Sequence, residues 1–241
     1  MPSRPRIYTA GDHGFFIRFG DVISPAIHKR IFAALRALDR LRPAWVTDCI
    51  PTYCTILLLY DAAGVGPESV RAWIEETLSE ASHEAVSARL VRIPVWYDPE
   101  VGPDLEDLAR SRGLTVEQVI EIHTGPDYLV YMLGFKPGFP FLGNLDERLW
   151  TPRLANPRRD VAAGSVGIGG RQTGIYSIRS PGGWRILGRT PLRIFDAGRK
   201  DSFRILPGDK VRFFPVDREG FRRLEREENA TSGNRQERGQ T

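Results

Sequence analysis

The chain has 241 residues, of which 41% are hydrophobic and 27% charged, and its formal net charge is +4. This composition is typical of a soluble globular protein, and the length suffices for one large domain or two ordinary ones. No apolar run is long enough to cross a membrane, the N-terminus has no apolar signal-peptide core, and no cysteine–histidine group has zinc-ligand spacing. We therefore expect a cytoplasmic protein without a metal site. We also expect no membrane or nucleic-acid partner, since a charge of +4 does not by itself predict nucleic-acid binding.

The first ninety or so residues alternate between strand and helix patterns. Residues 7–19 read as a strand region broken at Gly11, and Ser24 with Pro25 forms a helix start. Two strands follow at 45–50 and 53–60, then a helix with one apolar face, then a strand at 88–95. The order β-α-β-β-α-β predicts a ferredoxin-like α/β domain over residues 1–92.

Two short helices are predicted after this domain. The first covers residues 104–112, and the second opens with the capping-box pattern Thr115-x-x-Gln118. The spacing of the second helix places His123 on its apolar face. A histidine so placed is either a hydrogen-bonded core residue or a proton-transfer group, and the core role is the commoner one.

Residues 128–196 are rich in glycine, proline and aromatic residues, and turn signals cut them into short apolar runs. This pattern favours a closed barrel or sandwich of short strands. Two further strands, 203–206 and 210–216, flank a turn. We assign residues 93–217 to this β domain. From 217 onward the chain is polar, and we expect residues 218–241 to begin as a helix at most and to end disordered.

Short catalytic motifs are absent from the sequence. Ala163 stands where a nucleophile elbow needs glycine, and Gln172 stands where a dinucleotide-binding loop needs its third glycine. No phosphate-binding loop of the type G-x-x-x-x-G-K-[ST] occurs, so the chain has no recognisable ATP motif.

Longer motifs in the β-rich stretch are more specific. The segments GFKPGFPFLGNLDERL, TPR, AGSVGIGGRQTGIY and SPGGWRILGRTPLRIFD, with GPDLEDLA and VIEIH before them, resemble the KipI/allophanate hydrolase subunit 1 family. The resemblance covers about residues 93–216. It implies an α+β fold, in which a small α/β domain precedes a cyclophilin-like β-barrel.

Bacterial members of this family include the B subunit of ATP-dependent 5-oxoprolinase. The resemblance therefore implies a non-autonomous hydrolase subunit that works with a homologous C subunit, and with an A subunit, to open the lactam of 5-oxoproline to glutamate. ATP would be used by the assembled complex. Two alternatives stay open: an inhibitor of a histidine kinase, as one family member is, or subunit 1 of a system that hydrolyses allophanate or a urea-derived amide.

The family-like positions suggest site residues. His123 could move a proton and Arg153 could hold a carboxylate, so both are candidate catalytic residues. Gln172, Thr173 and Tyr176 are candidate substrate-binding residues, because an amide or carboxylate needs such donors and acceptors. Each also has a structural explanation: Gln172 and Thr173 can satisfy backbone groups at a barrel turn, and Tyr176 can be a core aromatic. We expect His123, Arg153, Gln172 and Thr173 to converge on one face of the barrel.

Overall fold

The computed structural model describes residues 4–79, 88–199 and 201–236. Its backbone contacts divide the chain into two compact units, residues 1–87 and residues 88–241. Each unit has its own buried hydrophobic core.

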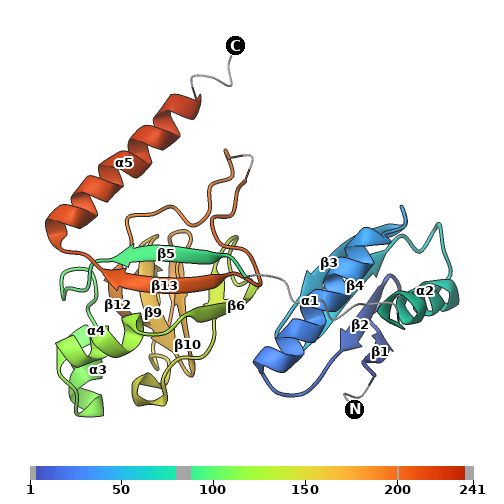
Figure 1. Ribbon diagram of the computed structural model, residues 1–241, viewed down its shortest axis with the longest axis horizontal. Helices are drawn as coiled ribbons and strands as arrows, with labels where there is room; N and C mark the ends of the chain where they lie inside the picture. Colours follow the sequence, from blue (N-terminus) through green and yellow to red (C-terminus); the bar gives the residue numbers. More distant parts are fainter. Residues whose placement is uncertain (1–3, 80–87, 200, 237–241) are drawn as a thin grey trace. The chain divides into compact units, whose positions relative to one another are not determined.

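The N-terminal unit is a four-stranded antiparallel sheet with two helices packed against it (Figure 1). Its elements are β1 (Arg6–Thr9), β2 (Gly14–Arg18), α1 (Pro25–Arg40), β3 (Val46–Pro51), β4 (Thr55–Tyr60) and α2 (Pro67–Ser79). The Ser24 side chain accepts a hydrogen bond from the Ile27 backbone and Pro25 opens α1, as the sequence predicts. Apolar residues from both helices and from strands β2, β3 and β4 form the core.

The order of elements in this unit differs from the predicted one. The region broken at Gly11 is a hairpin of two strands, β1 and β2, and the sheet runs β1-β2-β4-β3. The strand predicted to complete this sheet, β5 (Leu90–Val95), instead pairs in parallel with β13 (Lys210–Pro215) in the other unit. Arg89 reinforces that pairing through hydrogen bonds to the Asp209 carboxylate. The two units therefore divide before β5, earlier than the predicted boundary at residue 92.

The C-terminal unit is built on a seven-stranded sheet in the order β12-β9-β10-β7-β6-β13-β5 (Figure 1). Its remaining strands are β6 (Tyr128–Leu133), β7 (Pro140–Leu142), β8 (Arg158–Val161), β9 (Ser165–Gly169), β10 (Gln172–Ile175), β11 (Ser180–Gly182) and β12 (Arg185–Arg189), of which β8 and β11 form a separate two-stranded ribbon. The two edges of the sheet meet where Trp96 and Arg189 exchange backbone hydrogen bonds of 2.9 and 3.0 Å. These bonds bring the sheet close to a closed barrel.

Closure depends on a glycine. A Cβ atom on Gly188 would lie 2.5 Å from the Trp96 carbonyl oxygen, so only glycine lets the two edges approach this closely. The interior is filled by apolar residues from the strands and from two helices, α3 (Leu105–Arg112) and α4 (Val116–Thr124). The capping box predicted for α4 is present, with Thr115 and Gln118 bonded to each other's backbone. The α+β class, with a small α/β unit followed by a barrel-like sheet, is confirmed.

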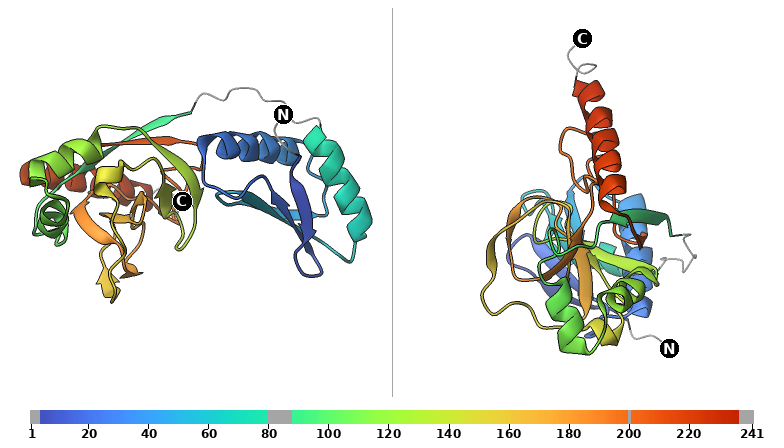
Figure 2. Two further views of the ribbon diagram at one scale, coloured as in Figure 1. Left: turned by 90° about the horizontal axis from the view of Figure 1, so that it is seen from below. Right: turned by 90° about the vertical axis from the view of Figure 1, so that its left-hand side faces the viewer.

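The polar tail begins as a helix, as the sequence allowed, and this helix, α5 (Arg218–Gln236), is longer than expected. The last residues of the expected disordered end, 237–241, lie outside the described residues. Phe221 is buried against Trp96, and the Glu228 carboxylate binds both Arg204 and Arg199, at 2.6 and 2.9 Å. These contacts tie the first turns of a polar helix to the barrel, from which its later turns extend (Figures 1 and 2).

Candidate functional site

Strand β10 separates the predicted site residues onto two faces. Successive side chains of a strand point to opposite sides of its sheet. Thr173 and Ile175 point into the barrel core, where both are fully buried. Gln172 and Gly174 therefore lie on the opposite side, which we call the outer face.

His123 meets Thr173 inside the core. The His123 Nε2 atom lies 2.8 Å from Thr173 Oγ1, and the Thr173 hydroxyl donates to the Gly167 carbonyl oxygen at 3.0 Å. The hydroxyl proton is used in that bond, so the Thr173 oxygen can only accept from His123. The His123 Nε2 atom therefore carries a proton and donates it to Thr173 Oγ1. His123 Nδ1 is then the acceptor for the Tyr97 hydroxyl, at 2.7 Å. Both ring nitrogens are hydrogen-bonded, and the ring also stacks on Phe213.

Burial sets the charge state of this network. Removal from water lowers the pKa of His123 to about 3, because the imidazolium form loses its hydration. Burial likewise raises the pKa of Tyr97 well above its ordinary value. At neutral pH the network is therefore uncharged, and every proton in it has an acceptor. This arrangement holds α4 against β9 and β10.

The outer face carries an aromatic cluster. Trp184 and Phe139 meet edge to face with ring centroids 5.3 Å apart, and Tyr176 packs on Phe139 in the same manner. A Cβ atom on Gly174 would contact both Trp184 and Phe139, which confirms that β10 turns this side toward the cluster. Gly169, paired directly with Gln172, faces the Trp184 indole nitrogen in the same way.

Arg153 lies at the exposed edge of this cluster. Its guanidinium carbon is 5.9 Å from the centre of the Trp184 ring, within the range of a cation–π contact. The Tyr176 hydroxyl oxygen accepts a hydrogen bond from the Trp184 backbone. Burial raises the pKa of Tyr176, and the nearby charges of Arg153 and Arg158 oppose that rise. Tyr176 is thus a neutral, buried phenol, and Arg153 is a cation open to solvent.

The four residues expected to converge therefore lie on two faces. The structure brings His123 and Thr173 together in the core, and it places Gln172 and Arg153 on the outer face with Trp184. Sequence reasoning missed one polar pair beside them. Buried Asp104 binds the Arg158 guanidinium at 2.7 Å and the Ile186 backbone N–H at 2.6 Å. No local signal could reveal these contacts, because Asp104 is 54 residues from Arg158 and 82 residues from Ile186 in sequence.

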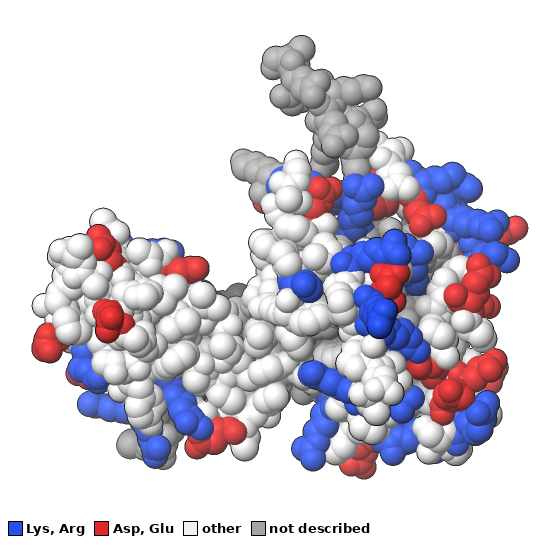
Figure 3. All heavy atoms as spheres, turned by 180° about the vertical axis from the view of Figure 1, so that it is seen from behind, with Lys and Arg blue, Asp and Glu red and all other residues white. Residues whose placement is uncertain are grey.

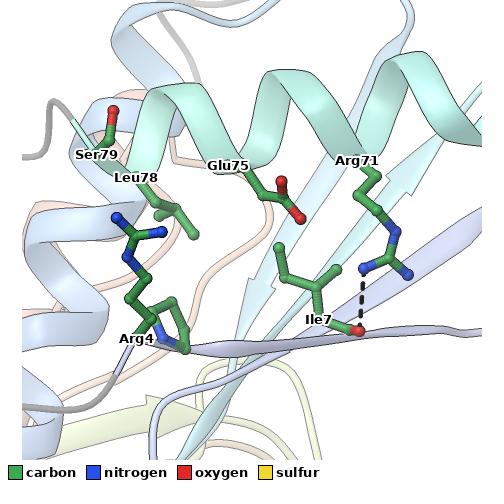
Figure 4. Close-up of a pocket in the computed structure, with 7 residues that line it drawn as sticks. Arg4, Ile7, Arg71, Glu75, Leu78 and Ser79 are labelled. Atoms are coloured by element: carbon green, nitrogen blue, oxygen red, sulfur yellow. Dashed lines mark hydrogen bonds between the residues drawn. The ribbon is translucent and has the colours of Figure 1, made fainter.

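Each unit also has a surface cavity. A cavity of about 480 Å³ in the C-terminal unit lies between α4 and the segment that follows β7. A cavity of about 330 Å³ in the N-terminal unit lies between β1 and α2, where Arg71 donates to the Ile7 carbonyl oxygen (Figure 4). In the part of the chain that the structure describes, no group of three or more histidine, cysteine or acidic residues could hold a metal ion.

Basic and acidic side chains are mixed over the face of the C-terminal unit that Figure 3 shows. Several of them form ion pairs with each other, including Arg179 with Asp160 and Arg212 with Asp127. None of the described helices is long and apolar enough to cross a membrane.

Comparison with known proteins decides the family. The carboxyltransferase domain, subdomain C and D, matches residues 5–205. The chain belongs to this family. It is 39% identical to the 5-oxoprolinase B subunit of Bacillus subtilis strain 168, over 95% of this chain and all of that protein. It is 41% identical to the 5-oxoprolinase B subunit of Escherichia coli O157:H7, over 88% of this chain and 97% of that protein.

Solved structures of carboxyltransferase-domain relatives share the fold. TTHA0988 superimposes with a TM-score of 0.77 at 39% identity, covering 85% of this chain. The chain spans only 40% of the length of TTHA0988, so in that protein the shared part is continuous with further polypeptide. PH0987 of Pyrococcus horikoshii matches over 90% of this chain and all of its own length, with 46% identity and a TM-score of 0.55. The family match includes every predicted site residue and ends before β13 and α5.

Proposed function

We propose that this chain acts as the B subunit of an ATP-dependent 5-oxoprolinase, which opens the lactam of 5-oxoproline to glutamate together with a homologous C subunit, and with an A subunit. The observation that carries the proposal is the likeness to two 5-oxoprolinase B subunits, which extends over 95% and 88% of this chain. No feature of the described residues favours a kinase inhibitor or an allophanate-hydrolysing protein over this function.

The outer face is the part of the chain that we assign to the reaction. Gln172 offers an amide donor and an amide acceptor, the groups that complement a lactam N–H and C=O. Arg153 offers a solvent-exposed guanidinium to the carboxylate of 5-oxoproline. In this proposal Gln172 and Arg153 bind and orient the substrate on the outer face, where Arg153 lies beside the buried ring of Trp184.

We assign no substrate contact to His123, Thr173 or Tyr176. All three are buried, and the His123–Thr173 network is saturated with hydrogen bonds. We therefore assign them to positioning: they hold β10 so that Gln172 faces the outer side. Proton transfer by His123 would require this network to open and a charge to form in the core, which burial opposes.

ATP is not assigned to this chain. The larger cavity is lined by two carboxylates, Glu121 and Asp146, and by one arginine, Arg148, so its lining lacks the surplus of positive charge that a triphosphate needs. The sequence also lacks a phosphate-binding loop. We accordingly place ATP binding on a partner protein and derive no step from it in this chain.

Co-expression tests the function. The chain is produced with homologues of the A and C subunits, and ATP-dependent release of glutamate from 5-oxoproline is measured for the complex and for each mixture lacking one component. We expect turnover only with all three, and stoichiometric copurification with the C subunit. Turnover that is unchanged without this chain, or lactam hydrolysis by this chain alone, would refute the proposal.

A further inference from the structure

The cavity beside α4 has the size and chemistry of a small-molecule site. Its volume of about 480 Å³ falls within the range of about 300–1,000 Å³ typical of such sites. The lining combines polar and apolar residues: Leu114, Gln118, Glu121, Ile122, Gly125, Pro126, Asn144, Asp146 and Arg148. Two of the sequence motifs that identify the family, VIEIH with the residues after it and GNLDER, supply most of this lining.

Some of the lining groups are suited to a cation. Glu121 is exposed and has no salt bridge among the described residues. Ile122 and Gly125 lie at the carboxyl end of α4, where the helix dipole is negative. An ammonium group placed here would meet a carboxylate and the negative end of a helix together.

Other lining groups are suited to a carboxylate. Arg148 is fixed by two parallel hydrogen bonds from its Nε and Nη2 atoms to Asp146, at 2.9 and 2.7 Å. These bonds lower the pKa of Asp146 to about 2, so the pair stays charged at neutral pH. The Nη1 group of Arg148 takes no part in these two bonds, so it is the group that Arg148 can offer to a ligand carboxylate. Gln118 uses its oxygen in the capping box, so its amide nitrogen is the group that it can offer to a ligand.

We propose that this cavity binds a free α-amino acid, with the ammonium group on Glu121 and the carboxylate on Arg148. That the amino acid is glutamate rests on the proposed function. Hydrolysis adds water across the ring C–N bond: the carbonyl carbon becomes a carboxylate, and the ring N–H becomes a primary ammonium group, which 5-oxoproline lacks. Recognition through Glu121 would therefore distinguish the product from the substrate and would give the complex a site that senses or holds the product.

Binding to the isolated chain is measured by titration calorimetry with L-glutamate, with glutarate and with 5-oxoproline. Glutarate keeps both carboxylates and lacks the ammonium group. We expect glutamate to bind with a Kd on the order of millimolar, and the other two to bind about tenfold more weakly or not at all. Equal binding of glutarate and glutamate, or no heat with glutamate at about 10 mM, would overturn the proposal.

Variants test the residues. Glu121→Gln should weaken glutamate binding about three- to tenfold, and Glu121→Asp should restore part of it. Glu117→Gln is the matched control, because Glu117 lies on the same helix outside the cavity lining and should bind as the wild type does. Unchanged affinity in Glu121→Gln, with an unchanged melting temperature, would contradict the assignment. These measurements need no turnover, so a failure of the amino-acid site is distinguishable from a failure of the oxoprolinase assay.

Discussion

His123 and Thr173 are 50 residues apart in sequence and are joined by a 2.8 Å hydrogen bond in the core of the barrel. The bond connects a helix to the middle of the sheet, and its direction follows from the Thr173 hydroxyl, which is committed to the Gly167 carbonyl oxygen. Strand alternation then places Gln172 on the opposite face. The position of the candidate substrate contact thus depends on a buried neutral histidine.

The Thr173→Val variant should be less stable than the wild type. Valine keeps the shape of the side chain and removes the hydroxyl, so the His123 N–H and the Gly167 carbonyl lose their partner in a fully buried site. We expect a loss of about 1–3 kcal/mol in the free energy of unfolding, measured by urea denaturation. Thr173→Ser keeps the hydroxyl and serves as the control, with a smaller loss. Equal stability of the valine variant and the wild type would show that the hydrogen bond does not hold the network together.

The stability of the chain should fall on acidification through His123. The pKa of His123 is lowered from 6.5 to about 3 in the folded state, so the unfolded chain binds a proton between these values that the folded chain does not. The stabilising contribution is complete above pH 6.5 and is lost progressively as the pH falls toward 3. Between pH 7 and pH 5 this loss amounts to about 2 kcal/mol.

His123→Gln isolates this effect, because glutamine does not titrate. The free energy of unfolding is measured for both proteins at pH 7 and pH 5, and the wild type should lose about 2 kcal/mol more than the variant. Carboxylates affect both proteins alike and cancel in the comparison. An identical pH dependence would mean that His123 is protonated in the folded protein.

Gly188→Ala should open or strain the junction that closes the barrel. The new Cβ atom would lie 2.5 Å from the Trp96 carbonyl oxygen, a distance that requires the two edges to separate. We expect a loss of about 1–3 kcal/mol and faster hydrogen exchange at the Trp96 and Arg189 amides. Gly66→Ala is the control, because no atom outside its chain neighbours lies closer than 3.8 Å to the added Cβ. Unaltered exchange at Trp96 in Gly188→Ala would argue against closure at this point.

Local signals in the sequence predicted the helices and the general nature of each unit. Ser24 with Pro25, and Thr115 with Gln118, act within a few residues of each other, so their roles can be recognised without a structure. The barrel was likewise indicated by turn residues. The sequence could also have shown that Gln172 and Thr173 face opposite sides of the sheet. Neighbouring residues of a strand alternate in this way, but no strand beginning at residue 172 was predicted.

Long-range pairing accounts for what the sequence did not reveal. Strand β5 is apolar enough to fit either sheet, so its own sequence does not say which sheet it joins. Its partner β13 lies over a hundred residues later in the chain; Arg89 and Asp209, which flank the paired strands, are 120 residues apart. The sequence allowed only a helical start for α5, because the helix is ordered by contacts with Trp96, Arg199 and Arg204 rather than by its own composition. The cavity beside α4 was not foreseen because its lining joins a helix to a segment beyond the next two strands.

The two faces of β10 can be compared directly in the assembled enzyme. Gln172→Ala and Thr173→Val are each made in the complex with the A and C subunits, and both the turnover of 5-oxoproline and the melting temperature are measured on the same preparation. If Gln172 contacts the substrate, Gln172→Ala should lower turnover about ten- to a hundredfold, equivalent to about 1–3 kcal/mol, at an unchanged melting temperature. Thr173→Val should lower the melting temperature instead. A Gln172→Ala complex that melts earlier while its folded fraction keeps full activity would contradict the assignment of the outer face to the reaction.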